Sequence, residues 1–196
     1  YSSAASDVYK RQGESKSNYD NKYGEPYFCG QLNVPLTEQG TESAQALVNY
    51  FTNKNIDHVY VSSLLRTQQT YEAIFPYNIP TTFTDLLKER SLGVFEGKYK
   101  KEVSQDETFY KYFNDDNFKD FRHSFTQKAP EGESYQDVFN RVATFFNSIV
   151  DPNADQIVIV AHQVVIRCIF VYLEQITKDE ALTAKIENCK PYLIEM

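Results

Sequence analysis

The positions of hydrophobic and polar residues divide this chain into short strand-like runs and longer runs with a helical period. The strand-like runs are rich in β-branched residues, which is typical of buried parallel strands. The helical runs repeat an apolar side chain every three or four positions. The strand-like runs cover residues 58–63 and 156–162, and the helical runs cover 37–54, 64–75, 134–150 and 163–176. Strand and helix therefore alternate through most of the chain.

This alternation predicts the fold class. Repeated strand–helix units give a parallel sheet with helices packed on it. We therefore expect an α/β fold of three layers, with a mostly parallel, open sheet and helices on both of its faces. Ser62 or Ser63 is expected to cap the helix over 64–75. Residues 98–128 break the alternation because they are aromatic and charged, and we interpret them as a helical cap inserted over one edge of the sheet.

Composition narrows the class of protein. The 196 residues carry a formal net charge of −7, which fits one domain with an inserted cap and argues against a nucleic-acid-binding surface. The three cysteines, Cys29, Cys168 and Cys189, form no CxxC pair, which favours a reducing, cytoplasmic setting. No apolar run approaches the roughly 18 residues of a membrane span. We therefore expect a cytoplasmic protein with no membrane or nucleic-acid partner.

Candidate chemistry lies at the predicted strand ends, where ligands of open α/β sheets bind. One strand end leads to Arg66, a second leads to His162, and a turn near Gly13 brings Arg11. The planar guanidinium of arginine matches phosphate oxygens, so this combination predicts a phosphate-ester site. Taken singly, Arg66 is equally interpreted as a salt-bridge partner and His162 as a buried structural histidine.

Other titratable and aromatic residues have structural interpretations. Glu89, taken alone, is a solvated loop charge. His58 opens a strand and is expected to be structural, whereas His123 is expected to lie on the surface. The aromatic residues from Phe109 to Phe125 are expected to form the core of the cap.

Six short blocks resemble the histidine phosphatase superfamily, also called the phosphoglycerate mutase-like family. In order they read RQGE followed by Asn18, Gly30 with VPLTEQG, SSLLRTQQT, LKERSLGVFEG, PEGES and VAHQVVIRC. The similarity runs from Gly13 nearly to the end of the chain, and six blocks in the right order make a specific match. We therefore expect residues 13–196 to form one histidine phosphatase domain, with the cap insertion at about 98–128.

The resemblance implies a phosphatase that forms a phosphohistidine intermediate. A histidine of the first block attacks phosphorus in such a reaction, and its position here is occupied by Gln12. The resemblance implies that Arg11, Arg66 and His162 hold the transferring phosphoryl group. It implies that Glu89 protonates the leaving alcohol and then activates water. No metal and no cofactor is implied, because arginines and histidines supply the positive charge.

Within the superfamily, AHQVVIRC and PEGESYQDVFNRV are most similar to fructose-2,6-bisphosphatase domains. This likeness implies a small phosphorylated substrate, a sugar bisphosphate such as fructose 2,6-bisphosphate. The implied substrate-binding residues are Gly13, Asn18, Gln163, Arg167 and Tyr135, together with Tyr99 (or Lys100), Lys119 and Arg122 from the cap. The loop over 19–33 departs from the subgroup's pattern. A phosphoglycerate mutase or a broad-specificity phosphomonoesterase of the same fold is the alternative. No kinase phosphate loop is present, and a bifunctional kinase–phosphatase that has lost an upstream kinase domain is one origin for such a chain.

Of the departures from the family pattern, Gln12 affects the predicted activity most, because an amide cannot replace imidazole as a nucleophile. The chain as written should bind phosphate esters and be nearly inactive. One explanation is a pseudoenzyme that binds a phosphorylated ligand without catalysis. The other is that residues 1–12 are a non-native segment, because SSAASDVYKRQ resembles the translated end of a transposase sequencing adapter. We favour the second explanation, and we expect the segment still to form a strand because Val8 and Tyr9 favour one.

Overall fold

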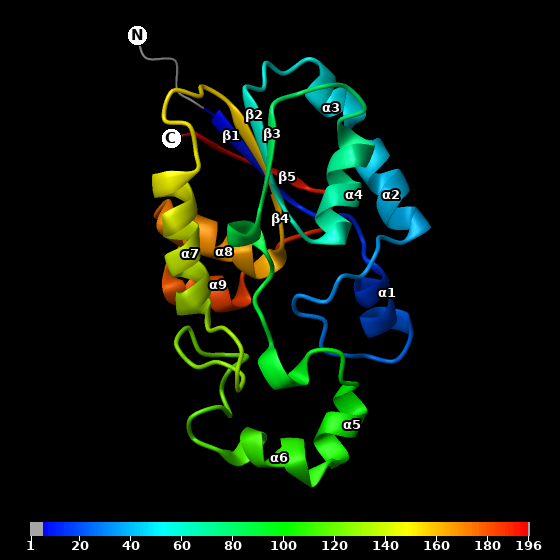
Figure 1. Cartoon of the computed structure of the whole chain (residues 1–196), viewed down its shortest axis with the longest axis vertical. Coiled ribbons are helices and arrows are strands. Elements are labelled where there is room, and N and C mark those ends of the chain that lie inside the picture. The colour runs from blue at the N-terminus through cyan, green and yellow to red at the C-terminus, as the bar shows by residue number, and fades with distance from the viewer. Residues whose placement is uncertain (1–5, 196) are drawn as a thin grey trace.

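The computed structural model describes residues 6–195 and shows a twisted sheet between two groups of helices, with a smaller helical lobe at one end (Figure 1). The strands are β1 (Ser6–Arg11), β2 (His58–Ser62), β3 (Thr81–Thr84), β4 (Ile157–Ala161) and β5 (Pro191–Glu195). The longer helices are α1 (Lys16–Tyr23), α2 (Glu38–Gln45), α4 (Leu65–Ile74), α6 (Glu107–Asn114), α7 (Tyr135–Ser148) and α8 (Gln163–Tyr172). The shorter ones are α3 (Val48–Thr52), α5 (Lys100–Gln105) and α9 (Lys178–Thr183), with 3₁₀ turns η1 (Asp85–Leu87) and η2 (Gly93–Phe95).

The sheet has the order β3-β2-β4-β1-β5. Its β2–β3, β2–β4 and β1–β4 pairs are parallel, and β5 pairs with β1 in the antiparallel direction. The mostly parallel, open sheet predicted from the sequence is therefore confirmed. In the register of β1 and β4, Arg11 lies opposite Ala161, so both strands end at the same level.

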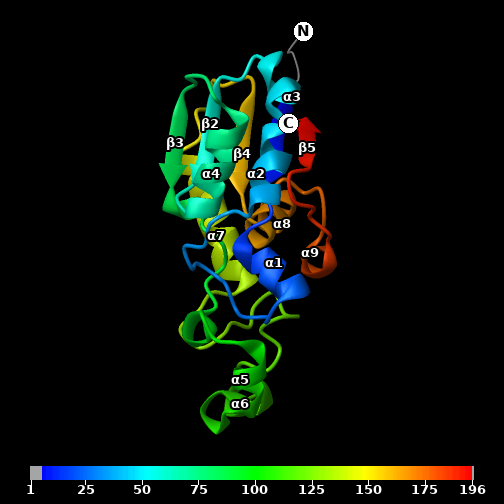
Figure 2. The same cartoon turned by 90° about the vertical axis from the view of Figure 1, so that its right-hand side faces the viewer.

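Alternate strand residues face two different cores, as the two-residue period of a strand requires. One core joins Tyr60, Ile157 and Ile159 to α7 and α8. The other joins Val59 and Val158, among others, to α2, α3 and α4. Figures 1 and 2 show these two groups of helices on opposite faces of the sheet, so the three predicted layers are present.

Two local predictions are corrected by the structure. The helical run over 37–54 is broken after Gln45 and continues as α3. Neither Ser62 nor Ser63 caps α4, because Leu64 occupies the N-cap position without a side-chain hydrogen bond. The hydroxyl of Ser62 is instead within hydrogen-bond distance of His162, and that of Ser63 bonds to Asp85.

The predicted cap lies beyond the carboxyl ends of the parallel strands, at the end of the sheet far from the start of β1 (Figure 1). It has its own apolar cluster, formed by Phe28, Phe95, Val103, Phe121 and Ala129. The prediction of a helical cap holds for α5 and α6, whereas residues 115–128 form turns and irregular backbone. His123 is exposed on the cap, as expected.

β1 comes from the adapter-like segment and is flanked by β4 and β5, as its strand propensity predicted. Residues 2–5 of that segment lie outside the described residues. No helix within residues 6–195 is long and apolar enough to cross a membrane.

Candidate active site

A cavity of about 400 Å³ lies where the parallel strands end. Arg11 and Gln12 reach it from the end of β1, Arg66 from the first turn of α4, and Gln163 from the first residue of α8. Glu89 enters from the segment that follows η1. Five predicted site residues, distant in sequence, thus line one cavity, because the carboxyl ends of parallel strands meet at one edge of the sheet.

Both predicted phosphate-binding arginines are anchored on backbone carbonyl groups. Arg66 is 3% exposed, and its guanidinium donates to Leu32 O at 2.8 Å and Gly30 O at 3.0 Å. Arg11 Nη1 donates to Ile186 O at 2.6 Å, while its Nε is buried without a partner. Carbonyl oxygens are neutral, so they orient a guanidinium without neutralising its charge. Both arginines are therefore suited to bind an anion.

His162 lies directly behind the cavity wall and immediately precedes Gln163. Its ring is fully buried, its Nε2 is 2.8 Å from Ser62 Oγ, and its Nδ1 has no partner. Burial, and then the nearby Arg66, lowers the pKa of His162 well below its ordinary value. Burial therefore favours the neutral form of the ring in the ligand-free site.

Gln12, which stands where the resemblance predicts the nucleophile, lines the cavity and is 4% exposed. Its backbone N–H donates to Ala161 O at 3.0 Å, which extends the β1–β4 pairing by one residue. Its side-chain Oε1 is buried without a hydrogen-bond partner. Unpaired buried polar atoms are costly, and among the described cavity-lining residues Arg11, Gln12, Asn21 and Arg90 each carry one that a polar ligand could satisfy.

Glu89 is the only acidic side chain among the residues that line the cavity. Its Oε1 accepts from the backbone N–H of Arg90 at 2.8 Å. Glu89 also interacts electrostatically with Arg11 and Arg90.

Gly13 and Asn18 are engaged mainly in folding contacts. The Gly13 N–H donates to Thr70 Oγ1 at 3.0 Å, and a Cβ at this position would lie 2.6 Å from Gly40 O. Gly13 is therefore required for close packing and does not line the cavity. Asn18 does line it, but its Oδ1 accepts from Ser15 in the capping box of α1 and from Asn188.

A second group of cations lines the cap side of the cavity and consists of Arg90, Lys100 and Arg122. The Arg122 guanidinium lies 4.9 Å from the centre of the Phe28 ring. Burial and then Arg122 lower the pKa of Lys100, and burial and then Arg90 lower the pKa of Arg122. Within the described part of the chain, no carboxylate lies within ion-pair distance of any of the three.

Four other predicted contacts are not brought to the cavity. Tyr99 forms an isolated bridge with Tyr27 and is exposed, and its neighbour Lys100 lines the cavity instead. Lys119 is exposed and pairs with Asp116. The buried Tyr135 accepts a hydrogen bond from Arg167 Nη1 at 2.7 Å, and Arg167 Nε donates to Ala184 O at 2.8 Å, so both lie behind the wall.

The sequence prediction missed one wall of the cavity. It is formed by uncharged polar residues of the α1 region and of the loop that departs from the family pattern. They are Ser15, Ser17, Asn21, Tyr27 and Cys29. Their position directly after the first block was the available signal. Arg90 was also missed, although it adjoins Glu89 in sequence. Among residues 6–195, no three His, Cys, Asp or Glu side chains are grouped to hold a metal ion.

Sequence comparison agrees with this geometry. A model of the histidine phosphatase superfamily, branch 1, matches residues 10–196. The 2,3-bisphosphoglycerate-dependent phosphoglycerate mutase of Chlamydia pneumoniae is 25% identical, over 94% of this chain and 91% of its own length. The 2,3-bisphosphoglycerate-dependent phosphoglycerate mutase 2 of Gloeobacter violaceus is 28% identical, over 96% of this chain and 84% of its own.

Solved structures share the fold. The alpha-ribazole phosphatase from Shigella flexneri superposes with a TM-score of 0.82 at 23% identity, over 97% of this chain and 90% of that chain. A mycobacterial glucosyl-3-phosphoglycerate phosphatase superposes with a TM-score of 0.73 at 21% identity, over 95% and 87%. The family model covers the cavity residues as well as the sheet, and the chain therefore belongs to the histidine phosphatase superfamily.

Proposed function

We propose that this domain is a phosphatase fold that binds a phosphate monoester and, with a histidine at position 12, hydrolyses it through a phosphohistidine. The observation that carries this proposal is the charge of the cavity. Five cationic side chains and one carboxylate line it, in a chain of net charge −7. Such a local excess of positive charge is suited to an anion, and Glu89 is suited to transfer a proton.

The proposed reaction has two steps. The imidazole at position 12 attacks phosphorus, the ester P–O bond breaks, and Glu89 gives its proton to the leaving oxygen. A water molecule then attacks the phosphohistidine, Glu89 takes a proton from that water, and phosphate leaves with its P–N bond broken. Arg11 and Arg66 stabilise the phosphoryl oxygens in both transition states. The neutral His162 contributes a hydrogen bond.

Gln12 removes the first step, so the chain as written should bind phosphate esters and turn them over negligibly. Replacing Gln12→His should raise kcat on phenyl phosphate by about 10³-fold or more, since loss of a covalent nucleophile in subtilisin cost roughly 10⁶-fold. Steady-state hydrolysis and trapping of a phosphoprotein measure this. Gln12→Asn is the matched control and should stay inactive. If the Gln12→His protein forms no phosphoprotein and releases no phosphate, the enzyme proposal fails.

For the substrate, we propose a phosphate monoester with a second anionic group. Support comes from Arg90, Lys100 and Arg122, which face the cavity without a described carboxylate partner. Fructose 2,6-bisphosphate, a sugar bisphosphate, and 3-phosphoglycerate, whose second group is a carboxylate, both fit this requirement. The names of the curated relatives favour the second compound, and the likeness to bisphosphatase domains favours the first.

The second anionic group is tested by comparing substrates on the Gln12→His protein. Fructose 2,6-bisphosphate and 3-phosphoglycerate should have lower KM values than phenyl phosphate. Arg122→Met should raise only the KM of the two substrates that carry a second anionic group. Equal KM values for all three would remove the support for a second anion site. If phenyl phosphate is the best substrate, a broad-specificity phosphomonoesterase is indicated.

The alternative to an enzyme is a non-catalytic phosphate-binding module. The observation that favours it is Gln12 itself, taken as native. Tight, saturable binding of a phosphate ester by the unaltered chain, together with no activity of the Gln12→His protein, would favour this reading.

A further inference from the structure

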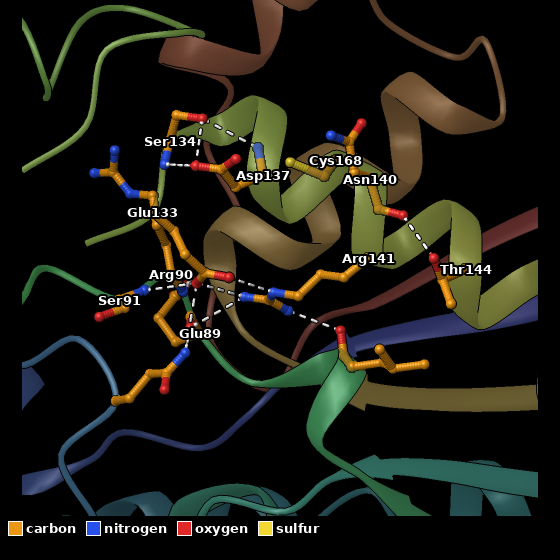
Figure 3. Close-up of polar contacts among 12 residues, drawn as sticks. Glu89, Arg90, Ser91, Glu133, Ser134, Asp137, Asn140, Arg141, Thr144 and Cys168 are labelled. Atoms are coloured by element: carbon orange, nitrogen blue, oxygen red, sulfur yellow. Dashed lines mark hydrogen bonds and ion pairs between the residues drawn. The ribbon is translucent and has the colours of Figure 1, made fainter. Parts of the chain in front are cut away.

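The segment that carries Glu89 is held from behind by an ion pair that does not line the cavity (Figure 3). Arg141 lies on α7, and Glu133 lies two residues before that helix begins. Arg141 Nε donates to Glu133 Oε1 at 2.8 Å, and Arg141 Nη2 donates to Glu133 Oε2 at 3.1 Å. A two-point pair of this kind fixes the plane of the guanidinium. The two side chains are 15% and 23% exposed, so water screens them less than an exposed pair.

Apart from one hydrogen bond that Glu133 Oε2 accepts from Gln31 Nε2 at 3.4 Å, the remaining side-chain contacts of the pair go to the backbone around Glu89. Gln31 Nε2 also donates to Glu89 O at 2.9 Å. Arg141 Nη1 donates to Leu86 O at 2.7 Å, and Arg141 Nη2 donates to Glu89 O at 3.2 Å. On the other side, Glu133 Oε2 accepts from the backbone N–H of Ser91 at 2.9 Å. The pair therefore holds the segment at three places, before, at and after Glu89.

The PEGES block explains why the pair can approach this segment so closely. A Cβ on Gly132 would lie 2.9 Å from Ser91 O, so glycine is needed where the two segments touch. Ser134 and Asp137 complete the capping box of α7 between themselves. Glu133 has no part in this capping box, and its carboxylate is turned to Arg141 and Ser91 instead.

The side chain of Glu89 depends on this backbone support. Within the described residues, its carboxylate accepts one hydrogen bond, from the N–H of Arg90. Its direction is therefore determined mainly by where the backbone of residues 86–91 lies. A displacement of about 1 Å in a reacting group can cost about 100-fold in rate.

We propose that Arg141 and Glu133 are positioning residues that hold Glu89 in place for proton transfer to the leaving oxygen. The inference rests on the proposed function, because that function gives Glu89 its proton-transfer role. Neither residue of the pair contacts the substrate in this scheme. Their effect on catalysis passes through the backbone of Glu89.

The test uses two substrates in the Gln12→His protein. Phenyl phosphate has a basic leaving oxygen that needs a proton, whereas 2,4-dinitrophenyl phosphate leaves as a stable anion. Arg141→Lys should slow the first-turnover release of phenol from phenyl phosphate about 100-fold, because lysine cannot reproduce the fork of arginine. It should change the first-turnover release of 2,4-dinitrophenol only a few-fold, because this release precedes the hydrolysis of the phosphohistidine, in which Glu89 acts on both substrates alike. Glu89→Gln should show the same selective loss.

Two further variants sharpen the test. Asn140→Ala changes the exposed neighbour of Arg141 on α7 and should leave both rates unchanged. The double variant Glu133→Ala with Arg141→Lys should lose no more than the larger single change, because the two residues act as one unit. Equal losses on the two substrates, or no loss, would overturn the proposal, since a general loss of structure does not depend on the leaving group.

A second measurement works on the unaltered Gln12 chain. Amide hydrogen exchange at Ser91 should become faster in Glu133→Ala and stay unchanged in Asn140→Ala, because Glu133 accepts the Ser91 hydrogen bond. If the Gln12→His protein hydrolyses neither substrate, the proposed function fails and this exchange decides whether the pair holds the segment. Unchanged exchange at Ser91 in Glu133→Ala would overturn the positioning role.

Discussion

Backbone pairing between β1 and β4 determines where the side chain at position 12 lies in the site. The N–H of Gln12 donates to Ala161 O, directly after the register pair of Arg11 and Ala161. A one-residue slip of β1 would turn the side chain to the opposite face of the sheet. A histidine introduced here would therefore be carried to the same point as the glutamine, which is why the substitution is a sharp test.

His162 should make the free energy of unfolding of the protein depend on pH. Burial lowers its pKa in the folded protein, so the unfolded chain binds a proton near pH 6.5 that the folded chain does not bind. The free energy of unfolding should therefore fall as the pH decreases below about 6.5, by up to about 1.4 kcal/mol per pH unit. His162→Asn should make this slope shallower. Urea unfolding at about pH 7.5 and about pH 5.5 measures the difference.

The exposed His123 is the control for that experiment. His123→Asn should leave the slope as it is in the unaltered chain. His58, whose pKa burial also lowers, is present in every variant and cancels in the comparison. A slope that does not change in His162→Asn would mean that the pKa of His162 is the same in the folded and the unfolded protein.

At the scale of elements, α7 connects the core to the Glu89 segment. It buries Val138, Val142 and Phe145 in the core that α7 and α8 form with one face of the sheet. Its first turn begins at the buried Ser134, whose side chain accepts from the N–H of Asp137. The start of the helix therefore also determines where Arg141, less than two turns further on, meets the catalytic segment.

Ser134→Ala should lower the free energy of unfolding by about 1 kcal/mol, because the N-cap hydrogen bond to Asp137 is lost. The pKa of Asp137, which hydrogen bonds to Ser134 hold below its ordinary value, should rise in the same variant. Urea unfolding and NMR titration measure the two effects. Ser148→Ala, at the exposed end of the same helix, is the control, and an equal effect of both changes would contradict the capping role.

Elements of strong periodicity could be predicted from the sequence, and their interruptions could not. The run over 134–150 forms a helix as expected, since its apolar face alone determines the period. The run over 37–54 breaks because Gly40 packs against the backbone of Gly13 while Phe51 packs against Phe75 in the core. Both contacts are tertiary, so spacing within the run carried no sign of the break.

At the scale of the whole molecule, the cap is a separate apolar unit. Phe95 is fully buried and its ring lies 5.3 Å from that of Phe121 and 5.4 Å from that of Phe28. Phe28 and Phe121 also line the cavity, with Arg122 beside them. The packing of the cap therefore determines where the second group of cations lies.

Phe95→Ala should destabilise the cap by about 3–5 kcal/mol, as for other buried phenylalanines. Because the cap cluster is separate from the two sheet cores, amide exchange should become faster in α5 and α6 and stay unchanged in β4. Tyr110→Ala, which removes an exposed ring from α6, is the control and should have little effect. An equal increase in exchange in β4 would mean that the cap and the sheet unfold together.

The separation of the cap from the sheet explains which site residues could be predicted from the sequence. Arg11, Arg66 and Gln163 could be predicted because each stands at or shortly after the end of a strand, and any parallel sheet brings these ends together. Glu89 was predicted from the family resemblance alone. The cap residues could not be assigned in this way. Which of two neighbours, such as Tyr99 and Lys100, turns toward the cavity depends on how the cap packs.

The register of β1 on β4 also has a genetic consequence. Histidine and glutamine codons share their first two bases and differ only in the third. Since the sheet delivers whatever residue stands at position 12, a single base change separates a binding protein from a hydrolase in the proposed function. In the chain as written, one base change at position 12 would therefore supply the nucleophile of the proposed reaction without any change elsewhere in the fold.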